Sequence, residues 1–142
     1  MERRAHDLDG LTEARAVWDF TTGDARRFFD RVSLMKETAE SFLAQGITID
    51  FVMLIHGPAT GFAAKSHAGT KFEKEACPLL GNIHALLAAL AALGVRIEVC
   101  FIAMERCLVT RENLIGCVTV EHNVFLNSIA LQNKGYACMQ VD

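Results

Sequence analysis

Cysteine is the residue type whose placement in this sequence most clearly predicts chemistry. Cys100 lies at the end of the apolar stretch 95–101, and the segment that begins at Ala103 is expected to start a helix. A helix N-terminus carries about half a positive charge, which favours a thiolate over a thiol. Because the thiolate attacks sulfur–sulfur bonds, this position predicts a nucleophile. The alternative interpretation is that Cys100 is a small buried hydrophobe.

Three further side chains are expected to act with that thiol. His56 ends the preceding apolar run, and paired strands lie about 4.8 Å apart, so its imidazole is expected to reach the Cys100 region. A histidine there acts as a base or counter-charge, although capping of backbone groups in the turn is an equally good interpretation. Arg106 supports a thiolate if it turns back toward Cys100. Cys107, seven residues after Cys100, is a candidate resolving thiol.

The other three cysteines indicate no shared function. Cys77 precedes a helix-opening proline on a long loop, whereas Cys117 and Cys138 are expected to be core strand residues. Five cysteines at irregular spacing argue against a disulfide framework. The N-terminal sequence is polar and has no signal-peptide core, so we expect free thiols and a cytoplasmic location.

Several common kinds of site are not predicted. Residues 56–66 end in Lys-Ser after a strand, but three residues separate Gly61 from Lys65, so the spacing of a phosphate-binding loop is missing. The sequence has no C-x-x-C pair, H-E-x-x-H helix, dinucleotide fingerprint or nucleophile elbow, so neither a metal site nor a serine hydrolase is expected. The chain has a net charge of −3, and its basic residues do not cluster in one stretch. Both features argue against binding of nucleic acid. No apolar run approaches the ~20 residues that span a bilayer.

The elements that must position these residues alternate between strand and helix. Apolar runs predict strands over 16–20, 51–55, 95–101, 117–120 and 136–141. Capping residues predict where the intervening helices start and stop: starts at Asp24, Pro78, Thr110 and Asn123, and stops at Gly46, Gly94 and Gly135. A further short helix is expected around residues 62–65. This alternation predicts right-handed crossovers and a mostly parallel five-stranded sheet between helical layers.

The 142 residues are expected to form a single α/β domain over 1–142, with a loose N-terminal arm over 1–14. In parallel sheets the working site lies beyond the carboxyl ends of the strands. That rule directs attention to residues 23–24, 56–57 and 100–103.

The sequence resembles the DsrE/DsrF-like family from about Ala16 to the C-terminus. The segment GVRIEVCFIAMERCLVTRENL (94–114) is similar to the family pattern in which a strand ends in Val-Cys, an alanine follows three residues on, and a short helix leads to a fourth strand. Residues 50–59, ending in His-Gly-Pro-Ala, resemble the family's second strand and its turn. Residues 129–137 resemble its last helix and strand.

The resemblance implies a three-layer α/β/α sandwich and assembly into homotrimers, hexamers or mixed complexes. It implies that Cys100 accepts sulfane sulfur as a persulfide and exchanges it with small sulfur-carrier proteins, without a metal or organic cofactor. Cys107 departs from the pattern, because many members have Arg-Gly where this chain has Arg106-Cys107. The loop 61–77 is variable in the family, so it carries nothing over.

Three functions follow as hypotheses. The leading one is a sulfurtransferase-like relay on Cys100, with Gly57 and the amides of residues 101–103 stabilising the charged sulfur, and His56 or Arg106 tuning the thiolate. The second is a non-catalytic oligomeric binding module in which Cys100 is buried and unreactive. The third is a redox switch that forms a disulfide between Cys100 and Cys107.

Overall fold

The chain folds around one parallel sheet whose strands come from five separate stretches of sequence. The computed structural model describes residues 6–142. The strands pair side by side in the order β4-β3-β2-β1-β5, and every pair is parallel. Their bounds are β1 (Glu13–Phe20), β2 (Thr48–Ile55), β3 (Arg96–Cys100), β4 (Thr119–Glu121) and β5 (Ala137–Val141). The predicted five-stranded parallel sheet is confirmed.

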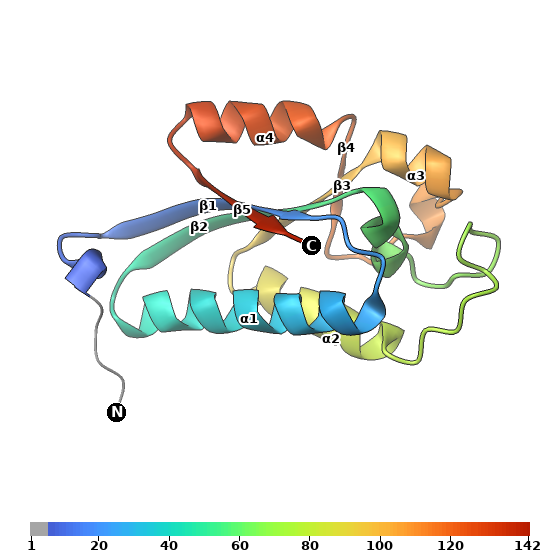
Figure 1. Cartoon of the computed structure of the whole chain (residues 1–142), viewed down its shortest axis with the longest axis horizontal. Coiled ribbons are helices and arrows are strands. Elements are labelled where there is room, and N and C mark those ends of the chain that lie inside the picture. Colours follow the sequence, from blue (N-terminus) through green and yellow to red (C-terminus); the bar gives the residue numbers. More distant parts are fainter. Residues whose placement is uncertain (1–5) are drawn as a thin grey trace.

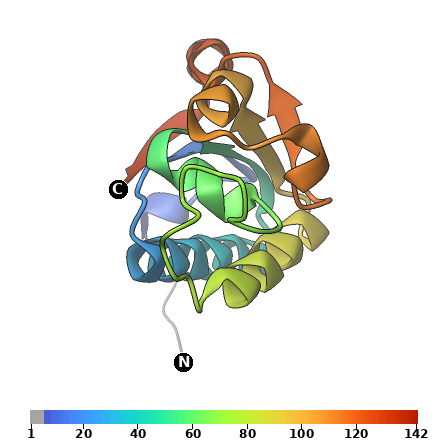
Figure 2. The same ribbon diagram turned by 90° about the vertical axis from the view of Figure 1, so that its right-hand side faces the viewer.

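Helices cover both faces of this sheet. Two long helices, α1 (Ala25–Ala44) and α2 (Leu80–Ala92), lie on one side, whereas α3 (Phe101–Cys107) and α4 (Val124–Asn133) lie on the other (Figures 1 and 2). Short 3-10 helices connect them at η1 (His6–Leu8), η2 (Gly57–Ala63) and η3 (Arg111–Asn113). The predicted α/β/α sandwich is therefore confirmed. Within residues 6–142, no helix has both the length and the apolar character needed to cross a membrane.

The polar caps that the sequence predicts for two helices are present. The Asp24 carboxylate accepts a hydrogen bond from the Arg27 amide at 2.9 Å and starts α1. The Asn123 side chain accepts one from the Phe125 amide at 3.0 Å and starts α4. Such bonds satisfy amides that have no partner inside the helix. Both helix starts are thus fixed by the residue types that the sequence shows.

Other boundaries differ from the predicted ones. Pro78 does not open α2, which begins at Leu80, because the Leu80 amide first closes a turn onto the Cys77 carbonyl. The short helix expected around 62–65 lies earlier, as η2. Thr110 precedes η3 but makes no capping hydrogen bond through its side chain. The most consequential difference is that α3 starts at Phe101, directly after Cys100, rather than near Ala103.

Part of the N-terminal region expected to be a loose arm has regular secondary structure. Of the residues expected to form a loose arm, 1–5 lie outside the described part of the chain. His6–Leu8 form η1, and Glu13 and Ala14 already belong to β1. β1 is therefore eight residues long, and it pairs along its whole length with β2.

The two faces of the sheet have hydrophobic cores of very different size. The larger core lies between the sheet and the α1–α2 layer and includes Phe20, Phe28, Met35 and Leu87. The smaller one lies under α3 and α4 and consists of Val17, Val52, Leu54, Cys100, Ala103 and Val124. Cys100 therefore sits at the edge of the thinner layer.

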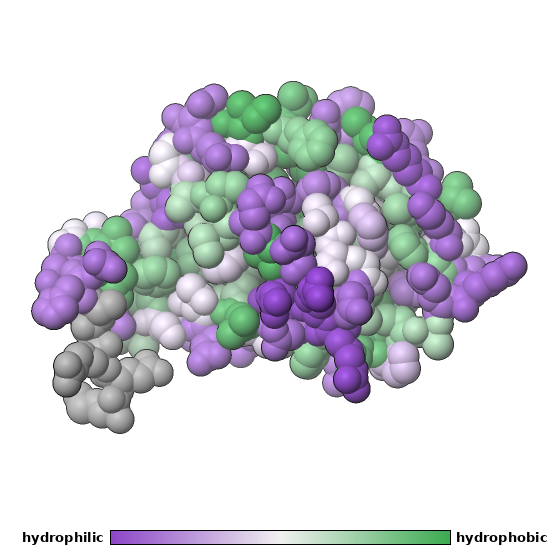
Figure 3. Space-filling view, in the orientation of Figure 1, coloured by the Kyte–Doolittle hydropathy of each residue, from purple (hydrophilic) through white to green (hydrophobic). Residues whose placement is uncertain are grey.

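Helix α4 buries little of its apolar surface against the sheet. Val124 is buried, whereas Phe125, Leu126 and Ile129 are 59–61 % exposed. Figure 3 shows hydrophobic atoms along the upper edge of the molecule, where α4 runs in Figure 1. The exposed group formed by these three residues is called the α4 patch below.

Candidate functional site

A pocket opens at the carboxyl ends of the central strands, where the sequence predicts the site. β2 pairs with β3 so that Ile55 lies opposite Val99. The next residues along these strands, His56 and Cys100, therefore emerge at the same edge of the sheet. Both line a cavity of about 450 Å3. Residues of η2, α3, the start of α4 and the loop after η2 complete its walls.

Cys100 is both the last residue of β3 and the residue that caps α3. Its backbone is extended, with φ −74° and ψ 121°, before the helix begins. Cys100 belongs to the smaller core together with residues such as Leu54 and Val124. It also lines the cavity, and 6 % of the residue is exposed. Cys100 is thus a buried residue at the wall of an open pocket.

One carbonyl oxygen near the Cys100 thiol already accepts a backbone hydrogen bond. The sulfur lies 4.0 Å from the carbonyl oxygen of His122. The amide of Ile102 donates to that same oxygen at 3.4 Å. The turn before α4 thus uses the Ile102 amide, and the expected part of the amides of residues 101–103 in stabilising a charged sulfur remains a prediction.

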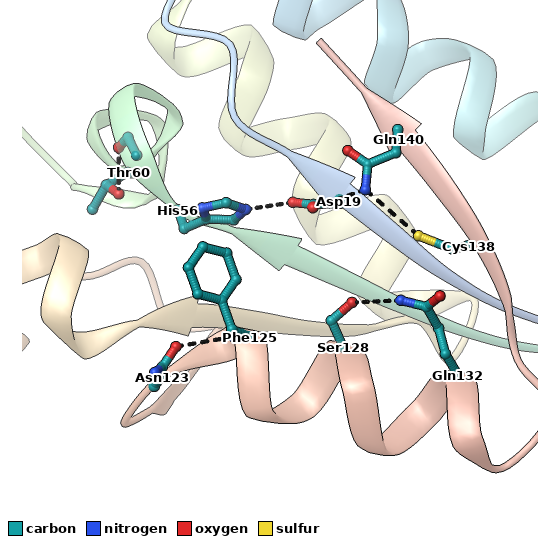
Figure 4. A network of polar contacts seen from close by, with 10 residues as sticks. Asp19, His56, Thr60, Asn123, Phe125, Ser128, Gln132, Cys138 and Gln140 are labelled. Atoms are coloured by element: carbon teal, nitrogen blue, oxygen red, sulfur yellow. Dashed lines mark hydrogen bonds and ion pairs between the residues drawn. The ribbon is translucent and has the colours of Figure 1, made fainter.

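His56 is held by a carboxylate that the sequence analysis did not single out. Its Nε2 atom lies 2.5 Å from Oδ1 of Asp19, near the end of β1. The ring also lies in a T-shaped arrangement with the Phe125 ring, with 5.3 Å between ring centroids. Figure 4 shows the His56 ring with Asp19 beside it and the Phe125 ring below it. Because an ionised carboxylate only accepts hydrogen bonds, Nε2 carries the proton in this pair. Nδ1 is then the ring nitrogen left as a hydrogen-bond acceptor.

Asp19 also contacts a side chain of the neighbouring strand β5. Gln140 Nε2 lies 3.5 Å from the second carboxylate oxygen of Asp19 and 3.7 Å from Cys138 Sγ. The signal for Asp19 was present in the sequence, as a carboxylate near the end of an otherwise apolar strand. It was missed because the predicted site was sought in the residues after each strand, whereas Asp19 lies one residue before the end of β1.

Gly57 adopts a conformation that suits glycine, with φ +58°. Its carbonyl oxygen accepts from Thr60 Oγ1 at 2.7 Å and lies 3.7 Å from Cys107 Sγ. Gly57 thus makes these two contacts through its carbonyl oxygen, one within η2 and one to Cys107. Its expected part in stabilising a sulfur on Cys100 remains a prediction.

Cys107 lines the same pocket but lies at the other end of α3. An α-helix rises about 1.5 Å per residue, so the seven steps between Cys100 and Cys107 correspond to roughly 10 Å. A disulfide needs Cα atoms within about 7 Å. The switch hypothesis, with a bond between these cysteines, is therefore incompatible with a folded α3. Burial raises the pKa of Cys107, while Lys71 and a hydrogen bond with Thr60 act in the opposite direction.

The loop between η2 and α2 forms part of the pocket wall. The Lys71 amide donates to the Cys107 carbonyl at 2.9 Å, and Asn113 holds the loop through two hydrogen bonds to the backbone of Ser66, at 3.1 and 2.8 Å. These contacts bring Lys71 and Phe72 to the cavity. Sequence reasoning gave this loop no role, because its polar residues follow no periodicity.

Arg106 also lines the pocket, from the last turn of α3. All five residues named from the sequence, Cys100, His56, Gly57, Arg106 and Cys107, are thus brought to one cavity. The arrangement combines two thiols, an imidazole oriented by a carboxylate, and two cationic side chains. These groups suit thiol chemistry on an anionic sulfur compound.

Comparisons with solved structures show the fold. MTH1491, a protein of unknown function from Methanobacterium thermoautotrophicum, is 14 % identical with a TM-score of 0.68, covering 89 % of this chain and 98 % of its own. The ychN protein from E. coli is 14 % identical with a TM-score of 0.64, covering 92 % and 98 %. BT1422, a conserved protein of unknown function from Bacteroides thetaiotaomicron, is 12 % identical with a TM-score of 0.64, covering 97 % and 100 %. No curated protein matches at a significant level.

A comparison with family patterns extends over nearly the whole chain. Residues 22–141 match the DsrE/DsrF-like family. This range contains the His56 turn, the segment around Cys100 and the last helix and strand, which are the parts that carried the resemblance. The chain therefore belongs to the DsrE/DsrF-like family.

Proposed function

We propose that this protein is a sulfur-relay protein that carries sulfane sulfur as a persulfide on Cys100. Membership of the DsrE/DsrF-like family favours a role of this type. The observation that carries the assignment to one residue is the position of the Cys100 thiol. It lies on the wall of a pocket that also contains the His56 imidazole, which Asp19 orients.

The proposed transfer needs no oxidant. The Cys100 thiolate attacks the outer sulfur of a donor persulfide, R–S–SH. A new sulfur–sulfur bond forms to Cys100, the donor's sulfur–sulfur bond breaks, and its electron pair leaves with R–S⁻. The outer sulfur keeps its proton and its oxidation level. An acceptor thiolate then attacks that outer sulfur, and Cys100 leaves as the thiolate.

His56 and Arg106 have distinct parts in this proposal. With its Nε2 bonded to Asp19, His56 accepts the thiol proton through Nδ1, directly or through water, and returns it to the departing thiolate. Arg106 lies on the pocket wall and adds positive charge where anionic sulfur enters. Asp19 acts through His56 and is therefore a positioning residue.

A second function has one observation in its favour. Cys100 is only 6 % exposed and packs against aliphatic side chains, as expected for an inert thiol in a binding module. In such a module the pocket would bind a ligand without reaction at Cys100. The rate at which the folded protein reacts at Cys100 separates the two functions.

Assembly into a homo-oligomer, a trimer or hexamer, and exchange with a small sulfur-carrier protein are part of the proposal. The α4 patch supports assembly, because three large apolar side chains on one helix are more than half exposed. Phe125 belongs both to this patch and to the pocket wall, so a second chain on α4 would lie beside the entrance. Native mass spectrometry measures the number of chains.

The relay is tested by incubating the purified protein with a persulfide donor and measuring its intact mass. The wild type is expected to gain about 32 Da, the mass of one sulfur atom, and to lose it to an acceptor thiol. Cys107→Ser, a matched change in the same pocket, is expected to keep the adduct. Cys100→Ser is expected to abolish it, and an adduct that persists in Cys100→Ser overturns the assignment.

A further inference from the structure

The pocket is far larger than the sulfur atom that the proposed relay would carry. Its volume of about 450 Å3 lies within the roughly 300–1,000 Å3 typical of pockets for small organic ligands. Phe72, Ile102 and Phe125 contribute apolar wall, which suits the carbon framework of a ligand. These dimensions favour a sulfur donor that is an organic molecule rather than a bare sulfur ion.

The fully charged side chains on the pocket wall are both basic. Lys71 and Arg106 line the cavity, and no aspartate or glutamate does. Across residues 6–142, neither cation has a carboxylate within ion-pair distance. Asp19 lies behind His56 and is bonded to it. Because the whole chain has a net charge of −3, this basic wall is a local feature that favours an anion.

The two residues that carry these cations, Lys71 and Arg106, have their backbones at the far end of α3 from Cys100. The bond from the Lys71 amide to the Cys107 carbonyl places Lys71 beside the last turn of α3, to which Arg106 belongs. Six or seven residues of helix separate this turn from Cys100, which corresponds to roughly 10 Å. An extended peptide spans about 3.3–3.6 Å per residue. A ligand of about three residues therefore spans the backbone separation between Cys100 and the residues that carry the two cations.

Resting on the proposed relay, we infer that the sulfur donor is a small organic persulfide of about tripeptide size, with carboxylates that bind Lys71 and Arg106. Its outer sulfur lies at Cys100, and its stem lies against the apolar wall. The thiolate of Cys100 takes the outer sulfur, the donor's sulfur–sulfur bond breaks, and the organic thiolate leaves. Glutathione persulfide has this size and charge and is the probe.

The test compares glutathione persulfide with the persulfide of glutathione diethyl ester, which has no free carboxylate. The second-order rate constant for loading Cys100 is measured by mass spectrometry for each donor, and their ratio gives the preference for carboxylates. We expect a ratio of about ten or more in the wild type. This corresponds to at least tenfold stronger binding of the donor that has free carboxylates. The double variant Lys71→Gln/Arg106→Gln is expected to bring the ratio close to one. Effects of either cation on the thiol itself cancel in this ratio.

Lys74→Gln is the matched control, because Lys74 is exposed on the same loop and does not line the pocket. It is expected to keep the wild-type ratio. Equal loading from both donors in the wild type, or a preference that survives in the double variant, overturns the inference. Inorganic polysulfide is the third donor. Loading by polysulfide alone overturns only the inference, whereas failure of all three donors overturns the relay as well.

Discussion

The Nε2 atom of His56 lies 2.5 Å from Oδ1 of Asp19, and both side chains are about 14 % exposed or less. The pair joins the carboxyl ends of two neighbouring parallel strands. Because Asp19 takes Nε2, the other ring nitrogen is the one available for chemistry in the pocket. Asp19 thus determines which face of the imidazole works beside Cys100.

Replacement of Asp19 by asparagine tests this relationship. We expect Asp19→Asn to slow persulfide loading of Cys100 by roughly a hundredfold, at the lower end of general acid–base effects, because the amide no longer fixes the tautomer. The measurement is single-turnover loading together with ¹⁵N NMR of the His56 ring. In the wild type the proton is expected on Nε2, whereas both tautomers are expected in the variant.

Gln140 provides the control for that experiment, since it contacts Asp19 without touching His56. Gln140→Ala is expected to change neither the tautomer nor the loading rate by more than about twofold. A slow Asp19→Asn variant with an unchanged ring tautomer would show that Asp19 acts only on the fold.

Cys107 is expected to stay protonated at neutral pH, because burial raises its pKa. In a Cys100→Ser background, the alkylation of Cys107 by iodoacetamide is followed against pH by peptide mass spectrometry. The midpoint is expected above the value of about 8.5 for a free thiol. Lys71→Gln is expected to move it higher still, because the Lys71 ammonium favours the thiolate. A midpoint equal to that of the same thiol in denaturant contradicts this account.

The site residues differ in how far the sequence alone could predict them. Strand alternation placed Cys100 and His56 at one edge of the sheet, since sequential strands in such folds commonly pair. The same rule pairs β1 with β2, but attention went to residues 23–24 beyond β1, so Asp19, one residue before the end of this strand, was missed. Lys71 reached the pocket through a loop held by backbone bonds to Cys107 and side-chain bonds from Asn113, which leave no periodic trace in the sequence.

Helix α4 shows a second limit of the sequence. Asn123 and Gly135 predicted its ends, and its apolar residues predicted a helix that packs. Periodicity does not say whether an apolar face meets the same chain, a second chain or solvent. The structure shows Val124 buried and the α4 patch exposed.

Glu98 is a buried carboxylate, and the unfavourable burial of its charge is expected to make the free energy of unfolding depend on pH. It is 7 % exposed, its Oε1 has no hydrogen-bond partner within residues 6–142, and burial, followed by the charge of Glu121, raises its pKa. The folded state therefore binds this proton more tightly than the unfolded state. The resulting stability is fully present below the unfolded pKa and is lost as pH rises through the folded pKa.

Glu98→Gln removes this titration. Urea unfolding at pH 4 and pH 8 is expected to show that the wild type loses more of its free energy of unfolding than Glu98→Gln across this range. Glu105→Gln, an exposed position on α3, is the control and should follow the wild type. Parallel pH dependences in the wild type and Glu98→Gln would mean that Glu98 does not titrate as described.

Leu108 ends α3 in the left-handed region, with φ 57° and ψ 40°, and is 63 % exposed. A side chain at such a position costs roughly 1 kcal/mol or more, and glycine avoids that cost. We expect Leu108→Gly to raise the free energy of unfolding by about 1 kcal/mol in urea titrations. Leu108→Ala keeps a Cβ atom and should show little gain. Equal stability of the two variants would contradict the strain.

The most direct test of the account is the rate at which the thiol of Cys100 reacts in the folded protein. Alkylation of Cys100 by iodoacetamide, followed by peptide mass spectrometry, is compared with the rate of global unfolding under the same conditions. The relay predicts modification far faster than unfolding, because the thiol borders an open pocket. Modification of Cys100 only at the unfolding rate would contradict it and favour the inert binding module.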